Sequence, residues 1–73
     1  MARIEVRSEV TGKVWKILIP VGQRVEAEDA VMVVESMKME IPVASEKSGE
    51  VVELMVGEGD SVEDGQVLAI VQT

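Results

Sequence analysis

The chain has 73 residues and a formal net charge of −7, from 14 acidic and 7 basic side chains. This length allows one small domain with a marginal core, and the acidity argues against nucleic acid or an anionic membrane as a partner. Cysteine, histidine and tyrosine are absent, which excludes disulfides, thiolate metal sites and most side-chain catalysts.

No segment approaches the 18 consecutive apolar residues of a membrane-spanning helix, and the first residues lack the apolar region of a signal peptide. We therefore expect a cytoplasmic protein that works without a membrane. Fifteen valines and a single aromatic residue, Trp15, indicate a β-rich core of small branched side chains. Trp15 is expected to pack on the core side of its strand.

Short apolar runs bounded by turn signals follow one another along the chain, as in an all-β sandwich or barrel. No window shows the 3.6-residue period of a helix. Pro42 cannot donate to a ladder and should lie at a sheet edge or a strand start. The predicted strands are, in chain order, residues 4–7, 13–19, 25, 30–35, 41–44, 50–56, 62 and 67–72.

An internal repeat divides the chain. Shifted by 37 positions, the sequence matches itself without a gap at ten positions, which include Ile4 with Ile41. Two copies predict two half-domains, about residues 1–36 and 38–73, related by a pseudo-two-fold axis inside one domain spanning residues 1–73. The glycines at the predicted turns are interpreted as turn residues only; they are Gly12, Gly22, Gly49, Gly59 and Gly65.

The segment from Glu35 to Glu40 lies between two apolar runs and predicts a β-hairpin whose turn is centred on Met37 and Lys38. Tight hairpin turns favour Asn-Gly, Asp-Gly or Gly-Gly because their central residues need positive φ, yet this segment holds no glycine. The same register places Glu35 opposite Glu40, an unfavourable pair of like charges. Local rules are most often broken at functional sites, so this hairpin is the candidate site.

Lys38 offers an amine at the tip of the predicted hairpin. Taken locally, it is either an ordinary solvated lysine or a group that is modified. After the shift of 37 positions Lys38 coincides with Met1, so a two-fold arrangement puts the hairpin at the pole opposite the chain termini. That position favours a group that reaches into another protein.

The run Ser36-Met37-Lys38-Met39 resembles the Met-Lys-Met attachment motif of the biotinyl (biotin/lipoyl attachment) domain family, which usually follows Ala or Ser. The likeness covers nearly the whole chain, and within the family it is similar to the small free-standing biotin carboxyl carrier proteins. The resemblance implies a flattened barrel of two four-stranded antiparallel sheets. It also implies covalent biotin as the cofactor, joined by an amide to the Lys38 side chain.

The resemblance further implies a non-catalytic carrier. A biotin protein ligase would modify it, a biotin carboxylase would charge it, and a carboxyltransferase would pass the carboxyl group to an acyl-CoA or a keto acid. Met37 and Met39 either contact the ligase and these enzymes or cap the barrel end. Ser36, Glu35 and Glu40 are further candidates for recognition, the glutamates being otherwise plain solvated charges. In isolation we expect a monomer.

Two other functions remain open. A lipoyl carrier domain shares the implied fold and the lysine, but lipoyl carriers typically have Asp before the lysine and Ala after it, where this chain has Met37 and Met39. An unmodified structural hairpin module of a larger protein is the third interpretation. A chain that starts at Met1 and stops just after its last predicted strand favours a free-standing unit.

Overall fold

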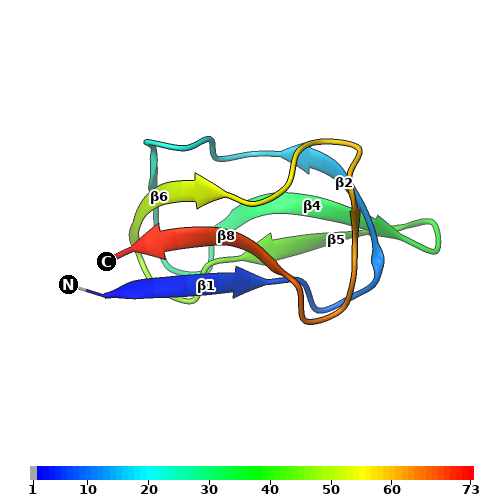
Figure 1. The fold of residues 1–73 in the computed structure, drawn as a ribbon, viewed down its shortest axis with the longest axis horizontal. Coiled ribbons are helices and arrows are strands. Elements are labelled where there is room, and N and C mark those ends of the chain that lie inside the picture. Colours follow the sequence, from blue (N-terminus) through cyan, green and yellow to red (C-terminus); the bar gives the residue numbers. More distant parts are fainter. Residues whose placement is uncertain (1) are drawn as a thin grey trace.

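The computed structural model describes residues 2–73 and consists of β-strands joined by turns (Figure 1). Within these residues there is no helix, and hence none that is long and apolar enough to cross a membrane. The all-β prediction is confirmed. The strands are β1 (Arg3–Arg7), β2 (Gly12–Ile17), β3 (Arg24–Val25), β4 (Ala30–Ser36), β5 (Met39–Ala44), β6 (Gly49–Leu54), β7 (Ser61–Val62) and β8 (Val67–Gln72).

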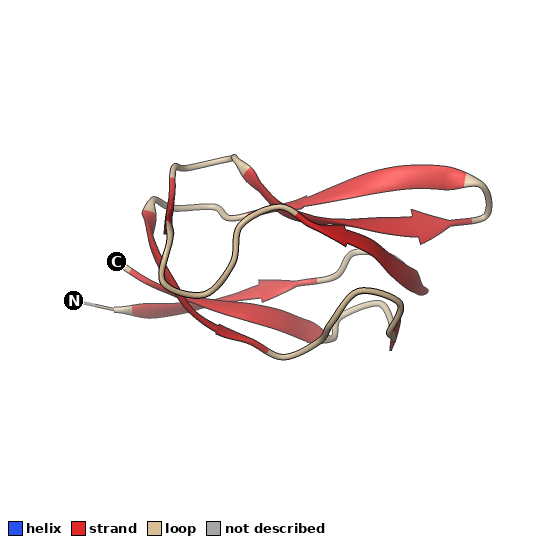
Figure 2. Ribbon diagram, turned by 90° about the horizontal axis from the view of Figure 1, so that it is seen from above, coloured by secondary structure: helices blue, strands red, loops and turns tan. Residues whose placement is uncertain are grey.

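The strands form two four-stranded antiparallel sheets, which Figure 2 shows as two layers. One sheet has the order β1-β8-β6-β3 and the other the order β5-β4-β2-β7. Each sheet thus combines two strands from the first half of the chain with two from the second. Because each half contributes to both layers, neither half can bury its apolar faces without the other.

The predicted pseudo-two-fold repeat is present in the strands and in the hydrogen bonds. The bounds of β2 and β3 become those of β6 and β7 when 37 is added, and the same shift turns one sheet order into the other. Turn contacts repeat as well: the N–H of Gly22 donates to the carbonyl of Val51 at 2.7 Å, and that of Gly59 to Val14 at 2.8 Å. The two halves are therefore equivalent in backbone structure.

The core lies between the sheets and is built mainly from valine. Two serines, Ser8 and Ser45, are buried with it, and their hydroxyl groups donate to the carbonyl oxygens of Val10 and Lys47, each at 2.6 Å. These bonds compensate the burial of the two polar groups. The buried apolar side chains are Val6, Val14, Val25, Val31, Met32, Val34, Val43, Val51, Val62, Leu68, Ala69 and Val71.

The prediction that Trp15 packs in the core is wrong, because 51% of its surface is exposed. The register between β2 and β4 shifts between Val14 and Lys16, so Trp15 is the extra residue of a β-bulge. Val14, which is 1% exposed, takes the inward position, and the indole points outward. The same bulge recurs in the second half between Val51 and Glu53.

The interpretation of Gly12 and Gly49 as turn residues is also wrong, since these glycines begin β2 and β6. A Cβ atom at Gly12 would overlap the carbonyl oxygen of Glu35, and one at Gly49 would overlap that of Gln72. Glycine is needed here so that two strands can approach closely. The other predicted turn glycines do lie in turns and have positive φ; they are Gly22, Gly59 and Gly65.

Strands β1 and β5 form edges of the two sheets, and they contact each other at one side of the sandwich. Pro42 lies in β5, so the prediction that this proline sits at a sheet edge is confirmed. A proline at this position lacks the N–H that a further strand would need for pairing.

Candidate functional site

The hairpin of β4 and β5 has the predicted register. Its strands pair from Ala30 with Ala44 to Ser36 with Met39, which leaves Met37 and Lys38 as a two-residue turn. Figure 1 shows this hairpin at one end of the long axis of the molecule, beyond the loops on either side. The sequence therefore correctly locates both the hairpin and its tip.

The turn adopts a conformation that its side chains disfavour. The φ angles of Met37 and Lys38 are 49° and 70°, and positive φ at both central residues is typical of a type I′ turn. For residues with a Cβ atom this region costs about 1–2 kcal/mol each. The long pairing between β4 and β5 holds the turn in this state, and Lys38 is thereby presented at a defined position.

Two contacts fix the base of the hairpin to the body of the domain. The hydroxyl of Ser36 donates to the carbonyl oxygen of Thr11 at 2.8 Å, and the side chain is half-buried. Gly12 lies directly against the backbone of Glu35. Sequence analysis missed Thr11 and misjudged Gly12, although the repeated glycine at position 49 was a usable signal that this position is constrained.

The two methionines that flank Lys38 point into solvent. Met37 is 94% exposed and Met39 is 65% exposed. Side chains this exposed do not cap the end of the barrel. The capping role considered for the two methionines is therefore excluded, most clearly for Met37. Exposed unbranched thioether side chains at a protruding tip form an adaptable apolar contact for a partner.

The charges on the hairpin are arranged in a row across the sheet. Glu35 lies opposite Glu40 on one side, as predicted, and opposite Lys13 of β2 on the other. All three side chains are exposed. The two carboxylates repel each other, and Lys13 partly offsets this because it pairs with Glu35 from the neighbouring strand. Sequence analysis did not identify Lys13, which comes next to Glu35 only through the pairing of β2 with β4.

The hairpin tip and the chain ends lie at opposite ends of the molecule (Figure 1). The N–H of Thr73 donates to the carbonyl oxygen of Ala2 at 2.8 Å, in the same way that Ser36 pairs with Met39 across the hairpin. Adding 37 to the number of Ser36 and subtracting it from that of Met39 gives Thr73 and Ala2. The termini thus occupy the position of a second hairpin tip, as the repeat predicts.

Lys38 is exposed, and among residues 2–73 it takes part in neither of the two ion pairs of the structure. Because Lys38 is exposed at the protruding tip of the hairpin, its Nζ atom is accessible to another protein. The chain has no histidine, cysteine or tyrosine to perform catalysis on a group attached there. This chemistry fits an amine that is acylated by another protein and then presented to further ones.

Known proteins share this sequence and this fold. The chain is 41% identical over 63 residues to the biotin/lipoyl attachment protein of Bacillus subtilis, and the match covers 86% of both chains. It is 35% identical over 68 residues to the urea amidolyase of Saccharomyces cerevisiae, which covers 93% of this chain but 4% of that enzyme. The crystal structure of Kluyveromyces lactis urea carboxylase superposes with a TM-score of 0.93 at 39% identity, covering 99% of this chain and 6% of that one.

The model of the family described as "Biotin-requiring enzyme" matches residues 4–71. The chain belongs to this family of biotin and lipoyl attachment domains. Biotin is accordingly its cofactor, and such a domain is the carrier part of biotin-dependent carboxylases. The match with the family confirms the resemblance described from the Met-Lys-Met motif, and the two four-stranded sheets confirm the fold that it implied.

Proposed function

We propose that this protein is a biotin carboxyl carrier and that Lys38 is the residue that bears the biotin. The observation that carries the proposal is the position of Lys38, which lies in a left-handed turn at the tip of the hairpin, exposed and far from the chain termini. The cofactor itself is indicated by the family to which the chain belongs. A tethered cofactor visits two active sites at high effective concentration without being released.

Attachment requires the Nζ atom of Lys38 as a free amine. A biotin protein ligase would remove its proton, and the nitrogen lone pair would then attack the carbonyl carbon of an activated biotinyl ester. The new C–N bond is an amide, and the acyl–oxygen bond breaks as the leaving group departs with the electron pair. We assign the removal of the proton to the ligase, and this domain contributes the position of the amine.

Once attached, biotin supplies the ring nitrogen that carries the carboxyl group between a biotin carboxylase and a carboxyltransferase. The acceptor would be an acyl-CoA or a keto acid. The domain's part is to present this group, as a cytoplasmic monomer that docks with each enzyme in turn. Met37 and Met39 would provide apolar contact beside the lysine, while Glu35 and Glu40 would discriminate between partners by charge. Ser36 would act by holding the hairpin in place through Thr11.

Replacing Lys38 tests the attachment site. We expect co-expression with a biotin protein ligase to add the mass of one biotinyl group to the wild-type chain, measured on the intact protein and by avidin blotting. Lys38→Arg should show no adduct, and the matched control Lys47→Arg, which changes an exposed lysine elsewhere, should be modified normally. An avidin signal that survives in Lys38→Arg would refute the assignment.

Intact mass also separates the alternatives. A lipoyl carrier would gain the mass of a lipoyl group when it is made together with a lipoyl ligase, and a structural module would gain neither group. The favoured outcome is biotin, since both neighbours of Lys38 are methionine. The contact role of Met39 is tested by Met39→Leu, for which we expect an unchanged melting temperature and a changed rate of carboxyl transfer.

A further inference from the structure

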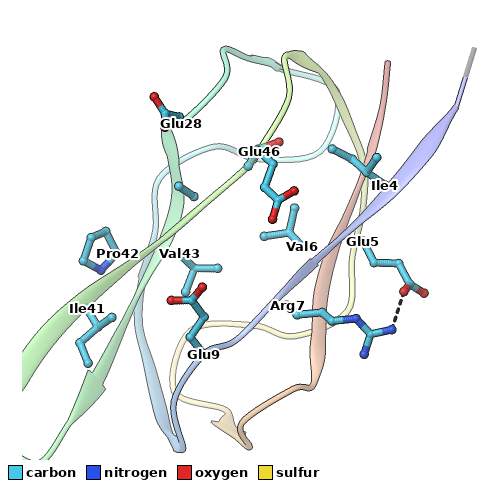
Figure 3. A pocket seen from close by; sticks show the side chains of 12 residues that line it. Ile4, Glu5, Val6, Arg7, Glu9, Glu28, Ile41, Pro42, Val43 and Glu46 are labelled. Carbon is cyan, nitrogen blue, oxygen red and sulfur yellow. Dashed lines mark hydrogen bonds and ion pairs between the residues drawn. The ribbon is translucent and has the colours of Figure 1, made fainter.

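A groove with a volume of about 550 Å³ lies along the edge strands β1 and β5 of the two sheets (Figure 3). We call it the edge groove; it is lined by residues 4–7 of β1, residues 41–44 of β5, and Glu9, Glu28, Ser45 and Glu46. The shift of 37 relates β1 to β5, so the groove is lined by equivalent residues from the two half-domains. Nothing in the carrier mechanism uses this groove.

The floor of the edge groove is apolar. Val6 and Val43 are 4% and 5% exposed, and their repeat-related neighbours Ile4 and Ile41 are partly buried. Figure 3 shows these four side chains between the two edge strands. An apolar side chain that covers this floor would stabilise the complex, because apolar surface is then removed from water.

The rim of the edge groove is acidic. Four exposed carboxylates line it, and the only cation among its lining residues is Arg7. The guanidinium of Arg7 is already occupied, because it donates to the carboxylate of Glu5 at 2.5 Å and to the carbonyl oxygen of Gly65 at 2.8 Å. In the view of Figure 3, the carboxylates of Glu9 and Glu46 point over the floor. These two groups therefore remain available to a positively charged ligand.

One of the two edge strands is open to pairing. Pro42 lies opposite Val33 and has no N–H, so the two residues form a non-hydrogen-bonded pair. The nitrogen of Pro42 therefore points away from β4. The equivalent residue in β1 is Glu5, whose N–H then points away from β8 toward the groove. An extended peptide can add to β1 through this N–H and the carbonyl beside it, whereas the proline blocks the same addition to β5.

We propose that the edge groove binds an extended, lysine- or arginine-bearing segment of a partner protein, which pairs with β1 and places its cationic side chains against Glu9 and Glu46. Charge selects this occupant. A second copy of this chain carries the same carboxylates and a net charge of −7, so it would be repelled. The proposal does not depend on the modification of Lys38.

The probe for this proposal is an end-capped peptide with alternating lysine and valine residues, titrated into the isotope-labelled full chain and followed by amide chemical shifts. We expect the shifts to concentrate in residues 3–7 and 41–46. The double variant Glu9→Gln/Glu46→Gln should bind about threefold to tenfold more weakly. The control double variant Glu50→Gln/Glu53→Gln, at exposed positions on β6, should bind within about twofold of the wild type.

Strand pairing is tested separately by Glu5→Pro, compared with Glu5→Gln. The fold accepts a proline at the equivalent position 42, so Glu5→Pro should stay folded yet lose peptide binding beyond the loss in Glu5→Gln. Lys38→Arg should bind the peptide like the wild type, which distinguishes this proposal from that of a biotin carrier. The proposal is overturned if the peptide does not bind, if a glutamate-for-lysine peptide binds equally well, or if the two double variants lose affinity equally.

Discussion

Gly12 lies against the carbonyl oxygen of Glu35 so closely that no side chain fits between β2 and the base of the hairpin. The repeat places Gly49 against the carbonyl oxygen of Gln72 in the same way at the other end of the molecule. One contact supports the lysine hairpin and the other supports the chain termini. This equivalence allows the same substitution to be compared at the site and away from it.

Gly12→Ala and Gly49→Ala should each lower the free energy of unfolding by about 1–3 kcal/mol, because the added methyl group forces the strands apart. Only Gly12→Ala should move the amide resonances of residues 35–40 and slow the modification of Lys38. Urea unfolding and ligase kinetics measure these effects. Equal slowing in both variants would mean that stability alone, and not the position of the hairpin, controls modification.

Met37→Asn should raise the free energy of unfolding by about 0.5–1 kcal/mol, since asparagine tolerates the left-handed region that Met37 occupies. The same variant should be a poorer substrate for the ligase because it loses the apolar side chain beside Lys38. Glu28, with φ of 70°, is strained in a turn outside the hairpin, and Glu28→Asn is the control. The control should gain similar stability, and its Lys38 should be modified at the normal rate. If Met37→Asn is stabilised and yet modified at the normal rate, Met37 has no role in recognition by the ligase.

Glu40→Gln should raise stability slightly, by about 0.2–0.5 kcal/mol at low salt, since it removes the repulsion between Glu35 and Glu40 and leaves Lys13 paired with Glu35. The gain should shrink as salt is added, because exposed charges are screened. Glu53 lies opposite Ile70 and has no like charge facing it from that strand, so Glu53→Gln serves as the control. Thermal melting at two ionic strengths measures both variants. A gain that is independent of salt would rule out charge repulsion as its cause.

Trp15→Ala should lower the free energy of unfolding by less than about 1.5 kcal/mol, because the indole is exposed. Leu68→Ala, at a fully buried position, should lower it by about 2–5 kcal/mol. The same exposure makes the single tryptophan accessible to acrylamide in the native state. Fluorescence quenching before and after unfolding in urea measures that accessibility. Strong native-state protection of the indole would contradict its outward position on the β-bulge.

The features that could be predicted from sequence are those that the repeat or the side-chain pattern encodes. The shift of 37 residues gave the two equivalent halves, and the apolar runs around Met37 and Lys38 gave the hairpin with its register. The missing N–H of Pro42 predicts a sheet edge or a strand start, and the structure has it on an edge strand.

The features that escaped prediction depend on how strands meet. The bulge at Trp15 adds a residue without any turn signal, so the tryptophan appeared to belong to a regular strand. The left-handed conformation of Glu28 has no local marker either, although the equivalent residue, Gly65, has the same sign of φ. The edge groove arises only when β1 and β5 come together from the two sheets.

Ala2 and Thr73 are bonded to each other at the end of a body 36 Å long, and the lysine turn forms its other end. A polypeptide linker joined at either residue would make the folded body a stiff lever arm that pivots about that joint. The radius swept by the attached group would then be the sum of linker, lever and lysine side chain. Shortening such a linker would reduce only the linker's share of this radius. The share of the folded body would stay the same, because the paired strands fix its length.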